Sequence, residues 1–251
     1  MNKEELMMQK RLIELSNIAF RRDIVTFSDF LNLNELNILH STPKNMFLAR
    51  YETFGGYDYA ERQMVAFLPD ALCYEYNYPM VMLKITPLHP KFAEELTHRD
   101  YLGAILNLGI ERCKMGDILV EEHSAILFIH QSLENFITGE LTRIKHTSVI
   151  ATIEDIQSFH YKPKTKEIKG SVSSLRLDGL LALAFSSSRS KLVAFIEGGK
   201  VYVNGKLITS NGYQVKENDI VSVRGLGRFR YLETMSKTKK GRYYVTLELF
   251  V

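Results

Sequence analysis

Four consecutive residues near the C-terminal end, Ser188–Arg189–Ser190–Lys191, combine hydroxyl and cationic side chains. The residues after them carry apolar side chains at helical spacing, so we predict that the run forms the first turn of a helix. The free backbone N–H groups of such a turn favour an anion, and arginine adds full charge and bidentate geometry. The hydroxyl of Ser188 or Ser190 can donate to the same group. The run therefore predicts a phosphate-binding site centred on Arg189.

Further basic residues flank this run in the sequence. Arg176 precedes a predicted helix, and Lys200 and Lys206 bracket a predicted hairpin. Arg228 and Arg230 stand two residues apart, so they share one face of a predicted strand. We expect all of these charges to converge on one phosphate backbone together with Ser188, Arg189, Ser190 and Lys191.

Each of these residues also has a plainer interpretation. Arg176 is equally suited to a structural ion pair with a carboxylate, and Asp178 to organising the start of a helix. Lys206 and Lys216 are typical of solvated surface lysines. Asn204 is explained by the turn that it forms, since Asn-Gly supplies the positive φ of a type I′ hairpin. The arginine of the Ser-Arg-Ser run remains the strongest single candidate.

The charge of the chain is unevenly distributed. Residues 171–251 carry 13 Lys and Arg against 6 Asp and Glu, a net charge of +7. Residues 1–170 carry 19 Lys and Arg against 23 Asp and Glu, a net charge of −4. A basic end on a mildly acidic body is typical of a protein that contacts nucleic acid through that end.

The sequence offers no catalytic constellation. None of the seven histidines lies four residues from another on a predicted helix, and His98 near Asp100 is better explained by helix capping. Cys73 and Cys113 form no CxxC motif, which argues against a zinc site. The glycines at 225 and 227 lead into a predicted strand, which argues against a nucleotide loop. We therefore predict no catalytic residue, no cofactor and no metal.

The compartment is predicted from what the sequence lacks. The first ten residues, MNKEELMMQK, have no apolar run of the kind found in signal peptides. No segment approaches the ~20 apolar residues that span a bilayer. No basic amphipathic helix accompanies the charged end. We expect a cytoplasmic protein without a membrane partner.

Hydrophobic periodicity predicts an α+β protein of three small α/β units. Residues 1–76 form an N-terminal α/β unit, with helices at 4–20 and 33–40 and strands at 46–51 and 62–68. Residues 77–160 follow the order β-α-β-β-α-β of ferredoxin-like and RRM-like domains, with a Thr97–Asp100 capping box. Its elements are predicted at 80–86, 97–109, 117–121, 125–130, 132–139 and 143–153.

The remaining residues are predicted as a connector and a third unit. Residues 161–170 are rich in lysine and poor in apolar residues, so they are interpreted as a basic linker, alternatively as an arm that touches RNA phosphates. Residues 171–251 are predicted to form two helices and a small antiparallel sheet, with a basic turn at 237–241.

The C-terminal unit resembles the S4 RNA-binding domain. The resemblance depends on four motifs in the expected order and spacing. They are Arg176–Leu177–Asp178, Ser188–Arg189–Ser190–Lys191, Gly199–Lys200–Val201–Tyr202–Val203–Asn204–Gly205 and Asp219–Ile220–Val221. An S4 domain implies binding to structured RNA.

The rest of the chain resembles the YlmH family of bacterial S4-domain proteins. The matching segments are Phe27–Asn32, Gly55–Gly56–Tyr57, Ala60–Glu61–Arg62, Leu96–Ala104, Leu108–Gly109–Ile110 and Lys114–Ile118. The resemblance implies a non-enzymatic, ribosome-associated protein that binds rRNA or tRNA on the large subunit. It also implies a role in translation quality control and a link to cell division.

Three points stay open at this stage. The alternative function is an RNA-modifying enzyme, such as a pseudouridine synthase, with an S4 appendage. The acidic body leaves room for protein partners of the N-terminal and middle units. The RRM-like unit also lacks paired aromatic residues on its central strands, where Phe128 and His130 are the only rings of residues 125–130. We therefore interpret it as a packing or protein-contact domain rather than a base-stacking one.

Overall fold

The computed structural model describes residues 3–70, 74–161, 163–237 and 241–250. The chain divides into two compact units, residues 1–161 and 162–251. Both combine helices with antiparallel sheets, as the predicted α+β class requires. Cys73 and most of the predicted basic turn at 237–241 lie outside the described residues. The finer division into three domains stays a prediction.

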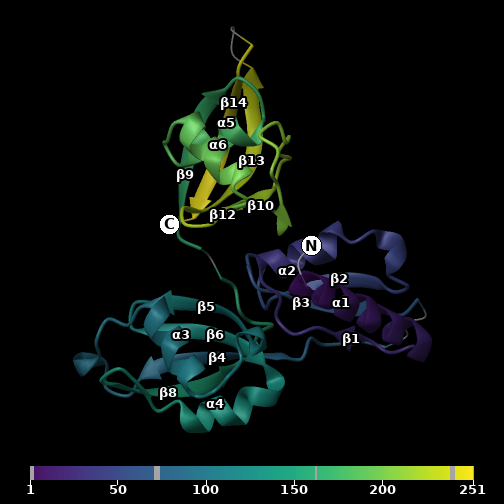
Figure 1. Cartoon of the computed structure of the whole chain (residues 1–251). Helices are drawn as coiled ribbons and strands as arrows, with labels where there is room; N and C mark the ends of the chain where they lie inside the picture. The colour runs from purple at the N-terminus through teal and green to yellow at the C-terminus, as the bar shows by residue number, and fades with distance from the viewer. Residues whose placement is uncertain (1–2, 71–73, 162, 238–240, 251) are drawn as a thin grey trace. The chain divides into compact units, whose positions relative to one another are not determined.

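The N-terminal part of the first unit is a three-stranded sheet with two helices on one face (Figure 1). The helices are α1 (Lys3–Arg22) and α2 (Leu33–Ser41), and Asn32 and Glu35 form a capping box at the start of α2. The sheet has the order β1 (Thr26–Phe27), β3 (Met64–Leu68) and β2 (Arg50–Phe54).

The strand predicted at 46–51 is corrected by the structure. A short 3-10 helix, η1 (Lys44–Met46), occupies its start, and the strand begins only at Arg50. Phe47 and Ala49 are buried without lying in the strand, and the Ala49 amide donates to the hydroxyl of Ser16 in α1 at 2.9 Å. The apolar run therefore reflects burial against a helix rather than pairing with another strand.

The middle part of the first unit has the predicted β-α-β-β-α-β order. Its elements are β4 (Met80–Pro87), α3 (His98–Asn107), β5 (Met115–Glu121), β6 (Ser124–His130), α4 (Glu134–Glu140) and β8 (Thr147–Glu154). With the short β7 (Arg143–Ile144), the sheet order is β5-β6-β4-β8-β7. The Thr97–Asp100 capping box is confirmed, and Gly109 follows α3 with a φ of 82°. The short 3-10 helices η2 (Pro90–Phe92), η3 (Arg112–Lys114) and η4 (Gln131–Leu133) lie between these elements.

The two central strands of this middle sheet, β4 and β6, are covered on both faces, whereas Ile150 and Thr152 of β8 stay exposed on the second face. Leu83 and Leu127 pack in the core under α3 and α4. On the opposite face Phe128 is fully buried, and its ring stacks on Tyr57 with centroids 5.4 Å apart. Phe30 packs in the same cluster. The surface that an RRM-like sheet would offer to a base is thus occupied by side chains from the N-terminal part.

A polar network joins the N-terminal and middle parts. Arg62 donates from Nε to the Met115 carbonyl at 2.8 Å and from Nη2 to the Phe30 and Arg112 carbonyls, each at 3.0 Å. The Asp117 carboxylate accepts from the Tyr57 hydroxyl at 2.8 Å and from the Arg62 amide at 3.2 Å. Because these bonds satisfy half-buried groups from both parts, they hold the two parts together.

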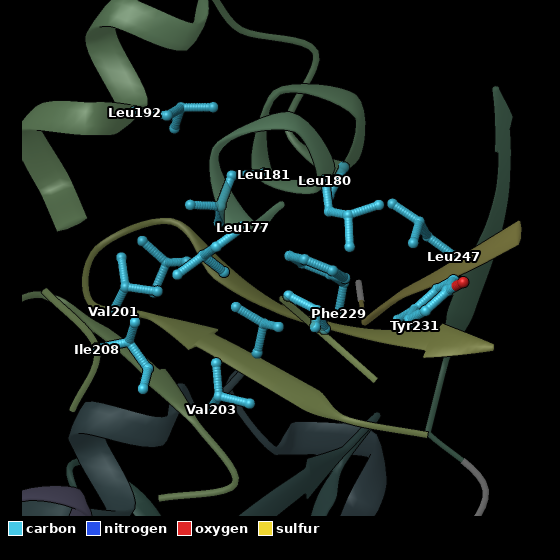
Figure 2. Close-up of a cluster of buried hydrophobic side chains, with 14 of the residues drawn as sticks. Leu177, Leu180, Leu181, Leu192, Val201, Val203, Ile208, Phe229, Tyr231 and Leu247 are labelled. Carbon is cyan, nitrogen blue, oxygen red and sulfur yellow. The ribbon is translucent and has the colours of Figure 1, made fainter. Parts of the chain in front are cut away.

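The second unit is a six-stranded antiparallel sheet with two helices packed on one face (Figure 1). The helices are α5 (Leu177–Ala184) and α6 (Arg189–Glu197). The sheet order is β11 (Lys206–Leu207), β10 (Val201–Val203), β12 (Ile220–Val223), β13 (Gly227–Lys237), β14 (Tyr243–Phe250) and β9 (Thr165–Val172). Figure 2 shows the core between the layers, where Leu177, Leu180 and Leu181 of α5 face Val201 and Phe229 of the sheet.

The predicted linker at 161–170 is also corrected. Residues 165–170 belong to β9, which pairs antiparallel with β14 from Thr165 opposite Phe250 to Val172 opposite Tyr243. Only Val172 is buried, and β9 forms an edge of the sheet. Lysine-rich side chains protect such an edge from pairing with other chains, and they also made the segment resemble a solvated connector.

Candidate nucleic-acid interface

Helix α6 begins as predicted from its serine run. Ser188 is the N-cap residue and accepts from the Lys191 amide at 3.4 Å, while its hydroxyl lies 3.2 Å from that of Ser190. Arg189 is the first helical residue, and all four side chains of the run are exposed. The first N–H groups of a helix have no partner within it, so this turn can donate to an anion.

Arg189 reaches from α6 to the beginning of α5. Its Nη2 donates to the hydroxyl of Ser173 at 3.2 Å. The guanidinium also lies against Gly179 in the first turn of α5, with Nη2 3.2 Å from where a β-carbon of residue 179 would stand. The side chain thus lies between the first turns of both helices, which brings two helix N-termini to one cation.

Arg176 lies at the same end of α5. It is the N-cap residue, and its Nε lies 3.3 Å from Oδ1 of Asp178. Asp178 is buried, whereas the Arg176 side chain is about half exposed. The predicted structural pairing of Arg176 is present, and its half-exposed side chain lies at the start of α5, the helix whose first turn Arg189 contacts. We call Ser173, Arg176, Ser188, Arg189, Ser190 and Lys191 the helix-start cluster.

The two hairpin lysines lie away from this cluster. Lys200 follows the far end of α6, and its Nζ lies 5.4 Å from the centroid of the Phe195 ring. A nine-residue helix is roughly 14 Å long, which separates Lys200 from Arg189. Lys206 is exposed on β11, after the turn. Lys200 therefore does not converge with Arg189 as expected, and Lys206 belongs to the edge strand β11.

The predicted type I′ turn is confirmed. Asn204 and Gly205 have φ values of 47° and 78°. The Asn204 side chain also donates to Asp219 at 2.7 Å and accepts from the Ile220 amide at 2.9 Å. Asp219 accepts in turn from the Lys216 amide at 2.7 Å. The asparagine and aspartate of the sequence motifs therefore connect the hairpin to β12.

Arg228 and Arg230 do not converge with the helix-start cluster, contrary to our expectation. Phe229 between them is fully buried in the core that the helices cover. Neighbouring residues of a strand point to opposite faces, so both arginines lie on the face away from α5 and α6. Arg230 pairs with Glu248 at 2.7 Å, and Arg228 lies over the Phe250 ring at 4.9 Å.

Two further arginines of this unit were missed by the sequence analysis. Arg224 follows β12 and lies 5.3 Å from the centroid of the Tyr202 ring. Arg242 donates to the carbonyl of Ser171 at 2.6 Å. Neither arginine belongs to a sequence motif. The only signal for them in the sequence was the net positive charge of residues 171–251.

Shifted pKa values in the first unit have structural causes. Lys145 and the Thr97 backbone and hydroxyl hold the pKa of Asp100 at about 2. Burial, followed by the nearby Arg62, lowers the pKa of Arg112 to about 10. Burial and Arg112 lower the pKa of His98. These groups belong to a helix cap and to the network around Arg62, so none indicates a catalytic role.

Metal sites and membrane-spanning helices are the other features considered for the described residues. Within the described ranges, no three His, Cys, Asp or Glu side chains gather in a way that could hold a metal ion. No single helix in the described part of the chain is long and apolar enough to cross a membrane. Helices α5 and α6 are long and apolar enough only when taken together, and the two helices are bent by 120° relative to each other.

Two family models match the chain. One is described as "Putative RNA-binding domain in YlmH" and matches residues 74–158. The other is the S4 domain, which matches residues 175–221 and so includes the helix-start cluster from Arg176 to Lys191. Both fall where the sequence motifs predicted an RRM-like unit and an S4 domain.

Two known proteins resemble most of the chain. The "Ribosome-associated protein quality control protein P2" of Bacillus subtilis is 29% identical over 250 residues, which cover 98% of this chain and 95% of that protein. A solved structure, "Cell division protein ylmH from Streptococcus pneumoniae", is 24% identical with a TM-score of 0.51, covering 62% of this chain and 94% of that one. The likeness to the latter supports the fold. Together with the family matches, these findings confirm the resemblance to YlmH proteins.

Proposed function

We propose that this YlmH-like chain is a non-enzymatic protein that binds structured ribosomal or transfer RNA through its S4 domain. The observation that carries the proposal is the helix-start cluster, in which Arg189 lies between the first turns of α5 and α6. Two helix N-termini with arginine, lysine and serine side chains are suited to a phosphate backbone. The net charge of +7 over residues 171–251 adds attraction that needs no base sequence.

The ribosome is the proposed location of this RNA. The Bacillus subtilis relative carries a name that associates it with the ribosome and with protein quality control. We extend this to the present chain, and we propose the large subunit and tRNA as its contacts in the cytoplasm. A connection with cell division and protein partners for the first unit stay predictions of the same kind.

Sedimentation through a sucrose gradient tests this proposal. We expect the wild-type protein in the large-subunit fractions of a cell lysate, and we expect Arg189→Ala to move to the top of the gradient. Arg11→Ala is the matched control, because Arg11 is an exposed arginine of α1 that pairs with Glu14 of the same helix. Wild-type protein at the top of the gradient would overturn the ribosomal assignment.

Salt dependence separates backbone recognition from other modes of binding. An interface dominated by phosphates releases counterions, so affinity should fall steeply with rising salt, and Arg189→Ala should reduce the slope by about one. An affinity that is constant from low to high salt would contradict binding through the helix-start cluster.

An RNA-modifying enzyme is the rival function. The name of the relative and the two RNA-binding domains favour a non-enzyme. Mass spectrometry of rRNA and tRNA from cells with and without the protein decides between the two. A modified nucleotide that disappears without the protein would support the enzyme, whereas identical nucleotide profiles are what we expect.

A further inference from the structure

Gly179 lies in the first turn of α5, directly beside the guanidinium of Arg189. A β-carbon at this position would stand 3.2 Å from Nη2 of Arg189, 3.8 Å from its Cζ and 3.5 Å from the Ser174 carbonyl oxygen. The first distance is tighter than most contacts that a β-carbon makes in proteins. A side chain at residue 179 would therefore meet the guanidinium first.

The helix itself gives no reason for glycine here. Residue 179 has an ordinary helical conformation and is absent from the residues with positive φ. Apart from Asp178, the other residues of α5 are leucine and alanine, which are strong helix formers. A glycine inside a helix costs about 1 kcal/mol relative to alanine, so its presence in this short helix calls for a packing reason. The described structure offers one such reason, which is the space taken by Arg189.

We propose that Gly179 is a positioning residue for RNA binding. Because residue 179 has no side chain, the Arg189 guanidinium can lie across the first turn of α5 and donate to the Ser173 hydroxyl. This holds a long, flexible side chain between the two helix N-termini before RNA arrives, which reduces the ordering cost of binding. The inference rests on the proposed function, because it explains how the central cation of that site is held.

The expected signature is a stability and an affinity that change in opposite directions. Gly179→Ala should leave the thermal stability of the second unit unchanged or raise it, because alanine favours the helix. Its affinity for purified large ribosomal subunits should fall by about five- to tenfold, less than when the whole Arg189 contact is lost. A mutation that merely damaged the fold would lower both.

A double-mutant cycle tests whether the effect passes through Arg189. Binding to purified large subunits is measured for wild type, Gly179→Ala, Arg189→Ala and the double variant. We expect Gly179→Ala to weaken binding only when Arg189 is present. Gly103→Ala is the matched control, because Gly103 lies in helix α3 and a β-carbon there would meet nothing within 4 Å. An equal loss with and without Arg189 would overturn the proposal.

A second readout does not depend on RNA. The Nε–Hε resonance of Arg189, assigned in the full-length protein with Arg189→Ala, should shift in Gly179→Ala and also in Ser173→Ala, which removes the hydroxyl partner. An unchanged resonance in Gly179→Ala would overturn the positioning role even if binding were weakened. If wild-type protein does not bind large subunits while the resonance does shift, the proposed function fails and the contact between Gly179 and Arg189 stands.

Discussion

The two large sheets of this protein are alike on the face that their helices cover and differ on the opposite face. Each is antiparallel and packs two helices on one face, over a core of aliphatic side chains. On the other face of the middle sheet, Phe128 and Met82 of the central strands are buried against the N-terminal part. The other face of the C-terminal sheet carries Arg228 and Arg230, each engaged by a neighbouring side chain. The second face of the middle sheet therefore packs against another part of the protein, whereas that of the C-terminal sheet carries charged side chains.

Because of this difference, the two sheets are expected to have different roles, which their common fold class does not distinguish. An RRM-like sheet is commonly assumed to stack bases on its open face. Here that face is covered at Phe128 by Tyr57, and the network around Arg62 lies beside it, which favours the proposed RNA contact through the S4 unit over base stacking on this sheet. The four predictions below test this division, beginning with the largest expected effect.

Phe128→Ala should destabilise the first unit by about 3–5 kcal/mol, because it opens a cavity between two packed layers. Binding to RNA should not change, since the ring is fully buried. Urea unfolding gives the stability, and the sedimentation assay gives the binding. Phe92→Ala is the control, because Phe92 is 87% exposed and its loss should cost little. Weaker RNA binding by folded Phe128→Ala protein would break the comparison.

Arg62→Met should destabilise the first unit by about 2–3 kcal/mol, because three backbone carbonyls lose their charged donor. The effect should be smaller than that of Phe128→Ala, since the apolar contacts between Phe128 and the N-terminal part remain. Faster hydrogen exchange of the β6 amides in the variant would indicate that the N-terminal part packs less tightly against the middle sheet. The exposed Arg11→Met variant should show neither change.

Arg189→Ala should weaken RNA binding by about 1–3 kcal/mol and leave the unfolding free energy nearly unchanged. Arg230→Ala is its counterpart on the other face of the same sheet. Because Arg230 is already paired with Glu248, its loss should cost less than 1 kcal/mol of stability and little affinity. Titration of a labelled tRNA measures the affinity of each variant, and urea unfolding measures its stability. A larger loss of affinity in Arg230→Ala would show that the sheet face is the RNA surface.

Lys145→Met should have the smallest effect, a change in one pKa. The Asp100 carboxyl has a pKa of about 2 because Lys145 and Thr97 stabilise its charged form. Removing Lys145 should raise that pKa towards its usual 3.8. A lowered carboxylate pKa contributes stability above pH 3.8 that is lost as the pH falls towards 2. NMR titration of the Asp100 carboxyl checks the shift, and an unchanged pKa would assign the whole effect to the helix cap.

Local signals in the sequence predicted the elements well where the cause was local. The Thr97–Asp100 capping box and the Asn204–Gly205 turn depend on residues close in sequence, and both are present. Strand β9 was missed because its stability comes from pairing with β14, some eighty residues later, while its own side chains are mostly polar.

The candidate site was predicted in part for the same reason. The first turn of α6 was found because its residues are contiguous. The expected convergence with Arg228 and Arg230 failed because it depends on which face of the sheet the helices cover. The contact of Arg189 with Gly179 and Ser173 joins residues of different elements, and no spacing in the sequence indicates it.

The position of β14 has a consequence for how the chain is made. Within the second unit this strand is synthesised after the other five, yet it lies inside the sheet between β13 and β9. A domain emerging from the ribosome tends to fold from its N-terminal side, but β9, the first strand of this unit, must wait for the last one. The second unit is therefore complete only once residues 243–250 have been synthesised. Chains interrupted before residue 243 would leave β9 without its partner and the core open beside it.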